Sequence, residues 1–221
     1  MKQTWLLVGG ALVVIGFAWM VLVGIPHTML VRVEAPPGLE PYTESQARGR
    51  TVYIRNGCIY CHTQQVRDDA FTSDVARGWG RRPTVPADYV YDRPHLMGTM
   101  RTGPDLINVG IRLPDPEWHL IHFYDPRAVV EWSIMPPYRF LFDEVPEEEV
   151  GPDDRVVAIP GRGPDEPVVV ATPDVLALVD YLRSLNRSYP LAQPAGAAED
   201  AGIAEPGEPA EVDDRSGRTM P

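Results

Sequence analysis

The five residues from Cys58 to His62 constrain this chain more than any other segment. They read Cys-Ile-Tyr-Cys-His, and the two cysteines are the only ones among 221 residues. The C-x-x-C-H spacing is the pattern of c-type haem attachment, because two thiols one short turn apart can each form a thioether to one vinyl group of a porphyrin. The adjacent imidazole then lies under the iron as an axial ligand. We therefore predict one covalently attached haem c, held by Cys58, Cys61 and His62.

Two other interpretations of this segment carry less weight. A redox-active dithiol has the same C-x-x-C spacing, but it belongs with a thioredoxin-like βαβ unit, and no such pattern surrounds Cys58. A zinc site could be completed by His119 and His122, but the sequence gap is long and zinc fingers usually space their histidines slightly wider. No thiol is left over for a disulfide framework.

A long apolar segment precedes the motif. From Trp5 to Ile25 the chain has 21 residues without a charge, which is enough for a helix to cross about 30 Å of hydrocarbon. A cleaved signal peptide is the alternative, but its apolar core is normally about 7–15 residues long and is followed by a small-x-small site. No Ala-x-Ala-like site follows Gly24. The segment therefore predicts an uncleaved, single-pass anchor.

Two independent features predict the orientation of this anchor. Lys2 precedes the apolar span, and the positive-inside rule keeps such an end in the cytoplasm. Haems of the c type are attached on the extracytoplasmic side, which places the motif across the membrane from Lys2. We expect the chain in the inner (cytoplasmic) membrane, with residues 1–4 in the cytoplasm and the haem domain on the periplasmic side.

The charge balance excludes one class of partner. The formal net charge is −11, and haem propionates would make the protein more negative still. Nucleic-acid binding needs a basic surface that neutralises phosphates, so we expect no nucleic-acid partner. No general base, activated nucleophile or open metal site is evident in the sequence, so we expect no catalytic centre in this chain.

Four helix-start signals flank the C-x-x-C-H motif, one before it and three after it. Thr43 with Gln46 predicts a capping box at the start of a helix that leads into the motif. Asp115, Asp125 and Thr172 each precede a proline, which predicts three more helix starts. The second of these helices is expected to be short, ending near residue 131.

The remaining segments predict loops, a hairpin and a tail. Residues 63–100 carry scattered Gly, Pro and Arg, which predicts mostly loop, and the acidic run at 143–154 predicts a solvated loop. The valine-rich runs at 156–159 and 168–170 predict a hairpin. The predicted domains are an anchor at 5–25, a linker at 26–41, a haem domain at 42–189 with an acidic and hairpin insertion at 143–171, and a disordered acidic tail at 190–221.

A low-spin electron-transfer haem needs a sixth ligand from elsewhere in the fold, usually Met or His. Met135 is the candidate that we favour, because it follows a predicted helix and precedes two prolines that would hold the thioether in one geometry. Met97 and Met100 have the ordinary interpretation of core methionines.

Two histidines offer an alternative to Met135. His119 and His122 lie three residues apart and can share one side of a helix. Either could make a bis-histidine haem, bind a propionate, or simply pack against its neighbours. We rank bis-histidine ligation below ligation by Met135.

Gly57 to His62, Met135 and the run from Thr102 to Leu106 together resemble a class I cytochrome c. More specifically, four segments resemble the membrane-anchored monohaem subunit (subunit II) of cbb3-type cytochrome c oxidases, namely residues 49–67, 91–110, 117–130 and 133–142. The resemblance covers roughly residues 1–142 and the last helix at 172–186. It departs at residues 143–171 and in the acidic tail.

This resemblance implies an all-α class I cytochrome c domain with a small β-hairpin insertion and one N-terminal transmembrane helix. In that family the carbonyl that corresponds to Pro104 accepts the second ring N–H of the proximal histidine, so Pro104 would orient His62. Arg101, Arg127 and Tyr138 would contact propionates or the haem edge. The implied partners are a catalytic haem–copper oxidase subunit and other cytochrome c subunits.

These features predict a tethered haem that relays single electrons to the catalytic subunit of a respiratory oxidase. A Met/His ligand pair tends to raise the reduction potential, which suits transfer toward a high-potential acceptor. Two alternatives keep the haem and change the partner: a free-standing tethered carrier, and the small cytochrome of a nitric oxide reductase. A peroxidase-like enzyme would need an open sixth position, which ligation by Met135 would close.

Overall fold

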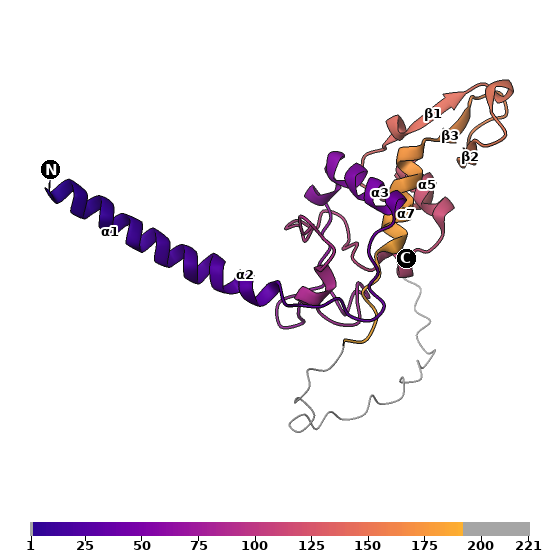
Figure 1. The fold of residues 1–221 in the computed structure, drawn as a ribbon. Helices are drawn as coiled ribbons and strands as arrows, with labels where there is room; N and C mark the ends of the chain where they lie inside the picture. The colour runs from indigo at the N-terminus through magenta and orange to yellow at the C-terminus, as the bar shows by residue number, and fades with distance from the viewer. Residues whose placement is uncertain (1, 192–221) are drawn as a thin grey trace, which may run out of the picture. The chain divides into compact units, whose positions relative to one another are not determined.

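The computed structural model describes residues 2–191, and Figure 1 shows the order of the elements along the chain. Met1 and residues 192–221 lie outside the described part, so the prediction of an acidic tail falls almost entirely beyond it.

The apolar N-terminal segment forms one continuous run of helix. α1 (Lys2–Trp19) passes through a π-helical turn at Met20–Gly24 into α2 (Ile25–Leu30) (Figure 1). None of these residues is buried within the chain, and the 29-residue helix Lys2–Leu30 is long and apolar enough to cross a membrane. Pro26 lies just after the π-helical turn, in the first turn of α2. The prediction of an extended linker is therefore wrong for residues 26–30.

Two capped helices form the centre of the fold that follows. α3 (Glu44–Arg55) begins at the predicted capping box, in which the Thr43 hydroxyl accepts from the Gln46 backbone and the Gln46 side chain accepts from the Thr43 backbone. α7 (Pro173–Ser184) begins at Thr172, whose hydroxyl accepts from the Val175 N–H. Both predicted starts are confirmed. The caps satisfy backbone donors that a helix start leaves unpaired.

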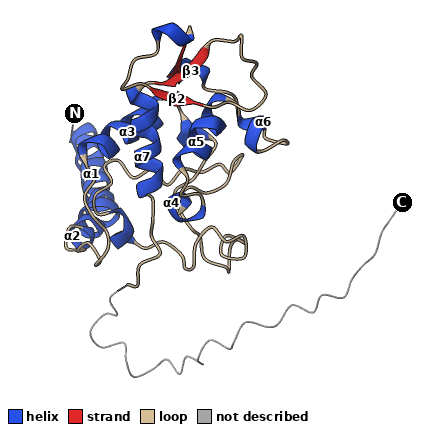
Figure 2. Cartoon of the chain, turned by 90° about the vertical axis from the view of Figure 1, so that its right-hand side faces the viewer, coloured by secondary structure: helices blue, strands red, loops and turns tan. Residues whose placement is uncertain are grey.

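The two helices approach each other unusually closely, and they lie side by side in Figures 1 and 2. A Cβ built on Gly49 would lie 1.8 Å from the carbonyl oxygen of Ala177 and 2.8 Å from the Cβ of Tyr181. A side chain larger than hydrogen at this position would force the helices apart. Val52 and Leu178 belong to the main core that surrounds this contact.

Three further helices precede the segment that carries Met135. α4 (Val109–Arg112) is a four-residue helix that the sequence did not predict, whereas α5 (Pro116–Tyr124) and α6 (Pro126–Val129) begin at the predicted Asp-Pro signals. Asp115 and Asp125 each accept a hydrogen bond from the backbone N–H two residues later. α6 ends two residues before the predicted end.

The segment predicted as an insertion builds a small sheet with strand order β1–β3–β2 (Figure 1, with β2 and β3 also labelled in Figure 2). β2 (Arg155–Val157) pairs antiparallel with β3 (Val168–Ala171), which confirms the hairpin. β1 (Phe142–Val145) pairs antiparallel with the other edge of β3. The prediction of a solvated loop is therefore wrong for residues 143–145, because pairing to β3 overrides the weak strand propensity of Asp143 and Glu144.

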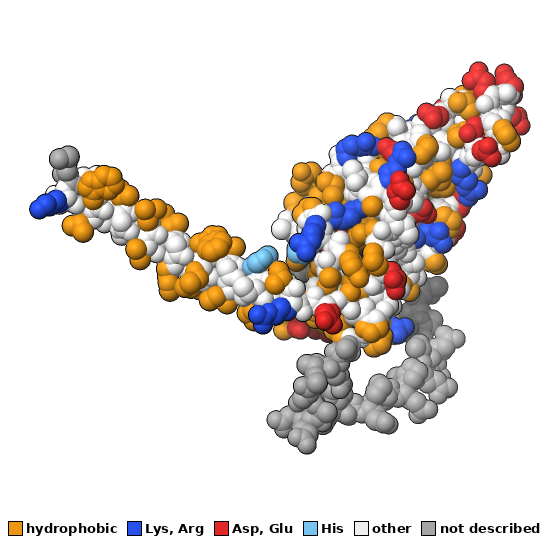
Figure 3. Space-filling view, viewed as in Figure 1, with side chains coloured by type: hydrophobic (Ala, Val, Ile, Leu, Met, Phe, Trp, Pro, Cys, Tyr) orange, Lys and Arg blue, Asp and Glu red, His pale blue; other side chains and the backbone are white. Residues whose placement is uncertain are grey.

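The sheet packs one face against the core, and acidic side chains lie around it on the surface. Phe142, Val157 and Val169 belong to the main core, and the ring of Phe142 lies 5.5 Å from that of Tyr124 in α5. Figure 3 shows acidic side chains gathered at the end of the molecule where the sheet lies. Residues 147–149 there form an exposed 3-10 turn of three glutamates.

The loops between residues 63 and 100 are held by buried ion pairs rather than by regular structure. Apart from a 3-10 turn at Pro86–Tyr89 they consist of turns and irregular segments, as predicted. Asp92 is 2% exposed and pairs with Arg50 of α3 at 3.2 Å and with Arg187 after α7 at 3.7 Å. Asp88 is fully buried and pairs with Arg82. Such pairs satisfy charges that loops could not bury alone.

Candidate functional site

The C-x-x-C-H motif begins where α3 ends. Gly57 has a φ of 72°, a left-handed conformation that glycine adopts at little cost, and it turns the chain into a 3-10 turn at Cys58–Tyr60. The backbone N–H groups of Cys61 and His62 both donate to the Cys58 carbonyl, at 3.2 and 3.0 Å. Neither cysteine forms a disulfide, and burial raises the pKa of the Cys58 thiol to about 12. The Cys58 thiol therefore lies in apolar surroundings.

The imidazole of His62 is held from one side by the Gly103–Pro104 segment. Its Nδ1 lies 2.8 Å from the Pro104 carbonyl oxygen, which accepts the Nδ1 proton. The remaining nitrogen, Nε2, keeps its lone pair. A Cβ on Gly103 would lie 2.3 Å from the His62 ring, so the close approach of this backbone requires glycine. Burial lowers the pKa of His62, which favours the neutral imidazole that a metal requires.

His62 opens onto a cavity of about 260 Å³. Its wall brings together five of the predicted site residues, which are Cys58, Cys61, His62, Pro104 and Met135, and it also includes Tyr138. Most of the other lining side chains are apolar and come from α5, α7 and the segment after α6. The cavity therefore brings two thiols, the His62 imidazole and the Met135 thioether together inside a largely apolar wall.

The segment after α6 delivers Met135 to this wall. The backbone N–H of Met135 donates to the Ser133 hydroxyl at 3.2 Å. The N–H of Tyr138 donates to the Phe123 carbonyl at 2.7 Å, which ties the segment to α5. Two prolines lie between Met135 and Tyr138 and limit the conformations of the backbone. The side chain of Met135 is half-buried and packs against the main core.

The structure does not bring Arg101 or Arg127 to the cavity wall. The Arg101 guanidinium donates to the Thr63 hydroxyl at 2.9 Å and to the Gln65 carbonyl at 2.6 Å, and it pairs with Asp74. Arg127 is exposed in α6. Arg101 thus supports the loop that follows His62, because Thr63 is the next residue.

Arg112 is the arginine that sequence reasoning missed. It lines the cavity, its Nε is buried without a hydrogen-bond partner among the described residues, and one of its other nitrogens donates to the Asp105 carbonyl. Burial lowers the pKa of Arg112. A buried guanidinium with an unused N–H fits an anionic group such as a propionate. The local sequence holds no signal for this role, since the four-residue helix α4 that carries Arg112 was itself not predicted.

The two histidines of α5 differ in environment. His119 is 2% exposed, and its Nε2 lies 2.8 Å from the Leu113 carbonyl oxygen. The ring of His122 stacks on Trp118 with centroids 4.6 Å apart, and its Nδ1 is buried without a hydrogen-bond partner among residues 2–191. Burial, with smaller effects from His119 and His62, lowers the pKa of His122 to about 4. Both rings line the cavity, and the imidazole of His122 is neutral at pH 7.

Within the described residues, no three His, Cys, Asp or Glu side chains gather as a metal site. The zinc alternative would require Cys58 and Cys61 to join His119 and His122 around one ion, so the structure offers it no ligand set. The nitrogen and sulfur donors of the cavity wall instead suit a metal held in a macrocycle.

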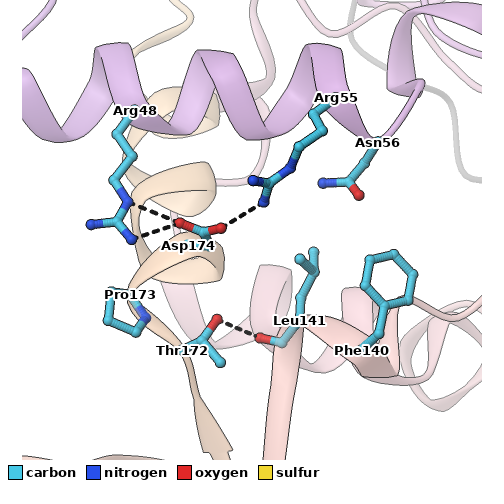
Figure 4. A pocket seen from close by; sticks show the side chains of 8 residues that line it. All are labelled: Arg48, Arg55, Asn56, Phe140, Leu141, Thr172, Pro173 and Asp174. Atoms are coloured by element: carbon cyan, nitrogen blue, oxygen red, sulfur yellow. Dashed lines mark hydrogen bonds and ion pairs between the residues drawn. The ribbon is translucent and has the colours of Figure 1, made fainter.

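A second hollow, of about 520 Å³, lies outside this cavity between α3 and α7 (Figure 4). Figure 4 shows Arg48 and Arg55 of α3 converging on Asp174 of α7. Arg48 donates to one oxygen of Asp174 at 2.9 and 2.7 Å, and Arg55 donates to the other at 2.6 Å. These ion pairs link α3 to α7. The hydrogen bonds from Arg55 and Arg48 lower the pKa of Asp174.

A protein-family model described as cytochrome c oxidase, mono-heme subunit/FixO, matches residues 1–158. The chain belongs to this family. It is a monohaem subunit of a cbb3-type oxidase, and the resemblance that the sequence motifs indicated is confirmed. The match includes the apolar helix, the C-x-x-C-H motif and Met135. It runs past residue 142 into the small sheet, so the predicted departure from the family is wrong for residues 143–158, and the last helix at 172–186 lies outside the match. No curated protein matches the chain.

Proposed function

We propose that this FixO-family chain is a membrane-tethered c-type cytochrome that passes single electrons to the catalytic haem–copper subunit of its oxidase. The observation that carries the proposal is the cavity wall, where Cys58, Cys61, His62 and Met135 meet. When bound there, a haem supplies one iron that alternates between the ferric and ferrous states. The thiols of Cys58 and Cys61 would anchor its vinyl groups.

The residues present fit a haem on three counts. The donor set of one imidazole and one thioether is a known axial pair for c-type iron. Gly103 lets its backbone pack directly against the His62 ring, where a Cβ would lie at 2.3 Å, and so helps to hold the imidazole that would bind the iron. The unpaired Nε of Arg112 offers a donor for a propionate, and Tyr138 lines the same cavity. A class I cytochrome c fold is our interpretation of the α3–α7 contact, with the motif directly after α3.

Each side chain has a distinct task in this proposal. The Pro104 carbonyl keeps the proton of His62 on Nδ1, which leaves the Nε2 lone pair free to bind a haem iron. Met135 supplies the thioether that raises the reduction potential. The apolar wall excludes water, which disfavours the more highly charged ferric state. Arg112 would partly neutralise a propionate, although its guanidinium is largely buried.

The apolar helix Lys2–Leu30 supports the proposal that the chain is tethered to the membrane. Such a tether would keep the haem beside a membrane-embedded acceptor. We place the haem domain on the periplasmic side of the inner membrane, because of Lys2 at the N-terminal end and because c-type haems are attached there. Other cytochrome c subunits of the complex would supply the electrons. Tethering raises the local concentration of the haem near its acceptor.

Spectroscopy of the purified full-length holoprotein tests the haem site. A covalent haem should remain with the chain on a denaturing gel, and Cys58→Ser with Cys61→Ser should abolish it. The oxidised protein should show a sulfur-to-iron charge-transfer band that Met135→Ala removes. Met100→Ala is the matched control, since Met100 is 58% exposed and outside the cavity wall. Survival of the band in Met135→Ala would refute the ligand assignment.

Purification in mild detergent tests the partner. A subunit of an oxidase should be recovered with a haem–copper catalytic subunit, and the complex should reduce oxygen when supplied with electrons. Recovery of the cytochrome alone under conditions that keep membrane complexes intact would contradict the subunit assignment and favour a free-standing carrier.

A further inference from the structure

The cavity wall contains an imidazole that the His62–Met135 pair does not use. His122 lines the cavity together with Met135. Its Nδ1 is buried and makes no hydrogen bond of ordinary geometry among the described residues, although the Pro126 carbonyl lies near the ring and acts to raise its pKa. Buried polar atoms are nearly always paired, and an unpaired one costs free energy. The His122 ring therefore lacks the full pairing that a buried imidazole ordinarily has, which leaves it available as a ligand.

The fold holds His122 beside the segment that carries Met135. The hydrogen bond from the Tyr138 N–H to the Phe123 carbonyl joins that segment to α5 one residue from His122. The Trp118 ring stacks on the His122 ring with an angle of 14° between their planes. This stack limits rotation of the imidazole and reduces the entropy that a ligand would lose on binding.

His119 is not equivalent to His122, although it lies on the same helix and lines the same cavity. The Leu113 carbonyl oxygen lies 2.8 Å from the Nε2 of His119, so ligation through this nitrogen would first break a buried hydrogen bond. No hydrogen bond of ordinary geometry holds the His122 ring in this way, although the Pro126 carbonyl lies near it. The geometry therefore separates two residues that their spacing in the sequence left equivalent.

We propose that His122 is a reserve axial ligand. When the Met135 thioether leaves the haem iron, a ring nitrogen of His122 takes the vacant position. This inference rests on the proposed haem site. The exchange breaks one iron–sulfur bond and forms one iron–nitrogen bond, and it moves no electron. The haem stays low-spin, and it loses the thioether that raises its reduction potential.

The test compares spin states in the full-length holoprotein. Met135→Ala should lose the sulfur-to-iron band and remain low-spin, with the spectrum of a bis-histidine haem and a lower midpoint potential. Met135→Ala with His122→Phe should become high-spin, and added imidazole should restore the low-spin state. His122→Phe alone should keep the sulfur-to-iron band, which shows that phenylalanine at this position leaves the haem fold intact.

Met135→Ala with His95→Phe is the matched control, because His95 is exposed and does not line the cavity. It should stay low-spin. A high-spin Met135→Ala protein would overturn the proposal even if the double variant does not fold, and so would a double variant that remains low-spin. Failure of the proposed haem site is seen separately, as a wild-type protein without covalent haem or without the sulfur-to-iron band.

Discussion

Gly49→Ala tests whether the contact between α3 and α7 holds the haem domain together. The new Cβ would lie 1.8 Å from the Ala177 carbonyl oxygen, where ordinary contacts begin at 3.4 Å. The helices would have to separate by about 1.6 Å. A flexible side chain could rotate away, but here the neighbour is backbone in the middle of a helix, so the strain cannot be relieved locally.

The expected loss of stability follows from two opposing effects. Overpacking a core costs about 1–3 kcal/mol, and the rigid backbone contact puts this site near the upper end. Alanine is a better helix former than glycine by about 1 kcal/mol. The net destabilisation should be about 2 kcal/mol, which lowers the melting temperature of a domain of this size by about 4–8 °C.

Thermal unfolding of the holoprotein measures the effect, followed by circular dichroism and by haem absorbance. Gly163→Ala is the control, because its Cβ would meet only the Glu166 side chain at 3.6 Å. This variant should melt within about 2 °C of the wild type, as most surface changes do. If Gly49→Ala and Gly163→Ala melt at the same temperature, the reasoning about the helix contact is wrong.

Three further changes probe charges. Asp92→Asn should destabilise the domain by about 3–5 kcal/mol in urea unfolding, since it leaves Arg50 buried without its acid. Because arginine partners lower the pKa of Asp174, its stabilisation is present at neutral pH and lost as the pH falls through that lowered value. Asp174→Asn should therefore flatten the acid side of the melting curve against pH. Arg112→Gln should lower the midpoint potential in a redox titration, whereas Arg127→Gln should leave it unchanged.

Local sequence signals predicted the helix starts well. Capping chemistry acts within one turn, so Thr43, Asp115, Asp125 and Thr172 indicated four starts correctly. β1 was missed because its sequence, Phe-Asp-Glu-Val, becomes a strand by pairing with β3. The two are separated by more than twenty residues of chain, and no local pattern records such pairing.

The candidate site likewise has residues that the local sequence predicted and residues that only the fold revealed. The motif at Cys58–His62 and the Met135 segment are short patterns whose chemistry is readable along the chain. Arg101 was predicted to contact the haem, but its guanidinium pairs with Asp74 and donates to the Thr63 hydroxyl. Arg112 lines the cavity wall instead. A guanidinium reaches several ångströms from its backbone, so sequence position says little about its partner.

The sequence by itself determined the donor types, the apolar N-terminal helix and the family, because each is written in contiguous residues. Only the tertiary structure decided which side chains share one cavity. It distinguished His119, whose ring is hydrogen-bonded to the Leu113 carbonyl, from His122, and it placed Arg112 rather than Arg101 on the cavity wall. The physical reason is that burial and hydrogen-bond pairing are settled between segments far apart in the chain, through the close contact of α3 with α7 and the attachment of the Met135 segment to α5.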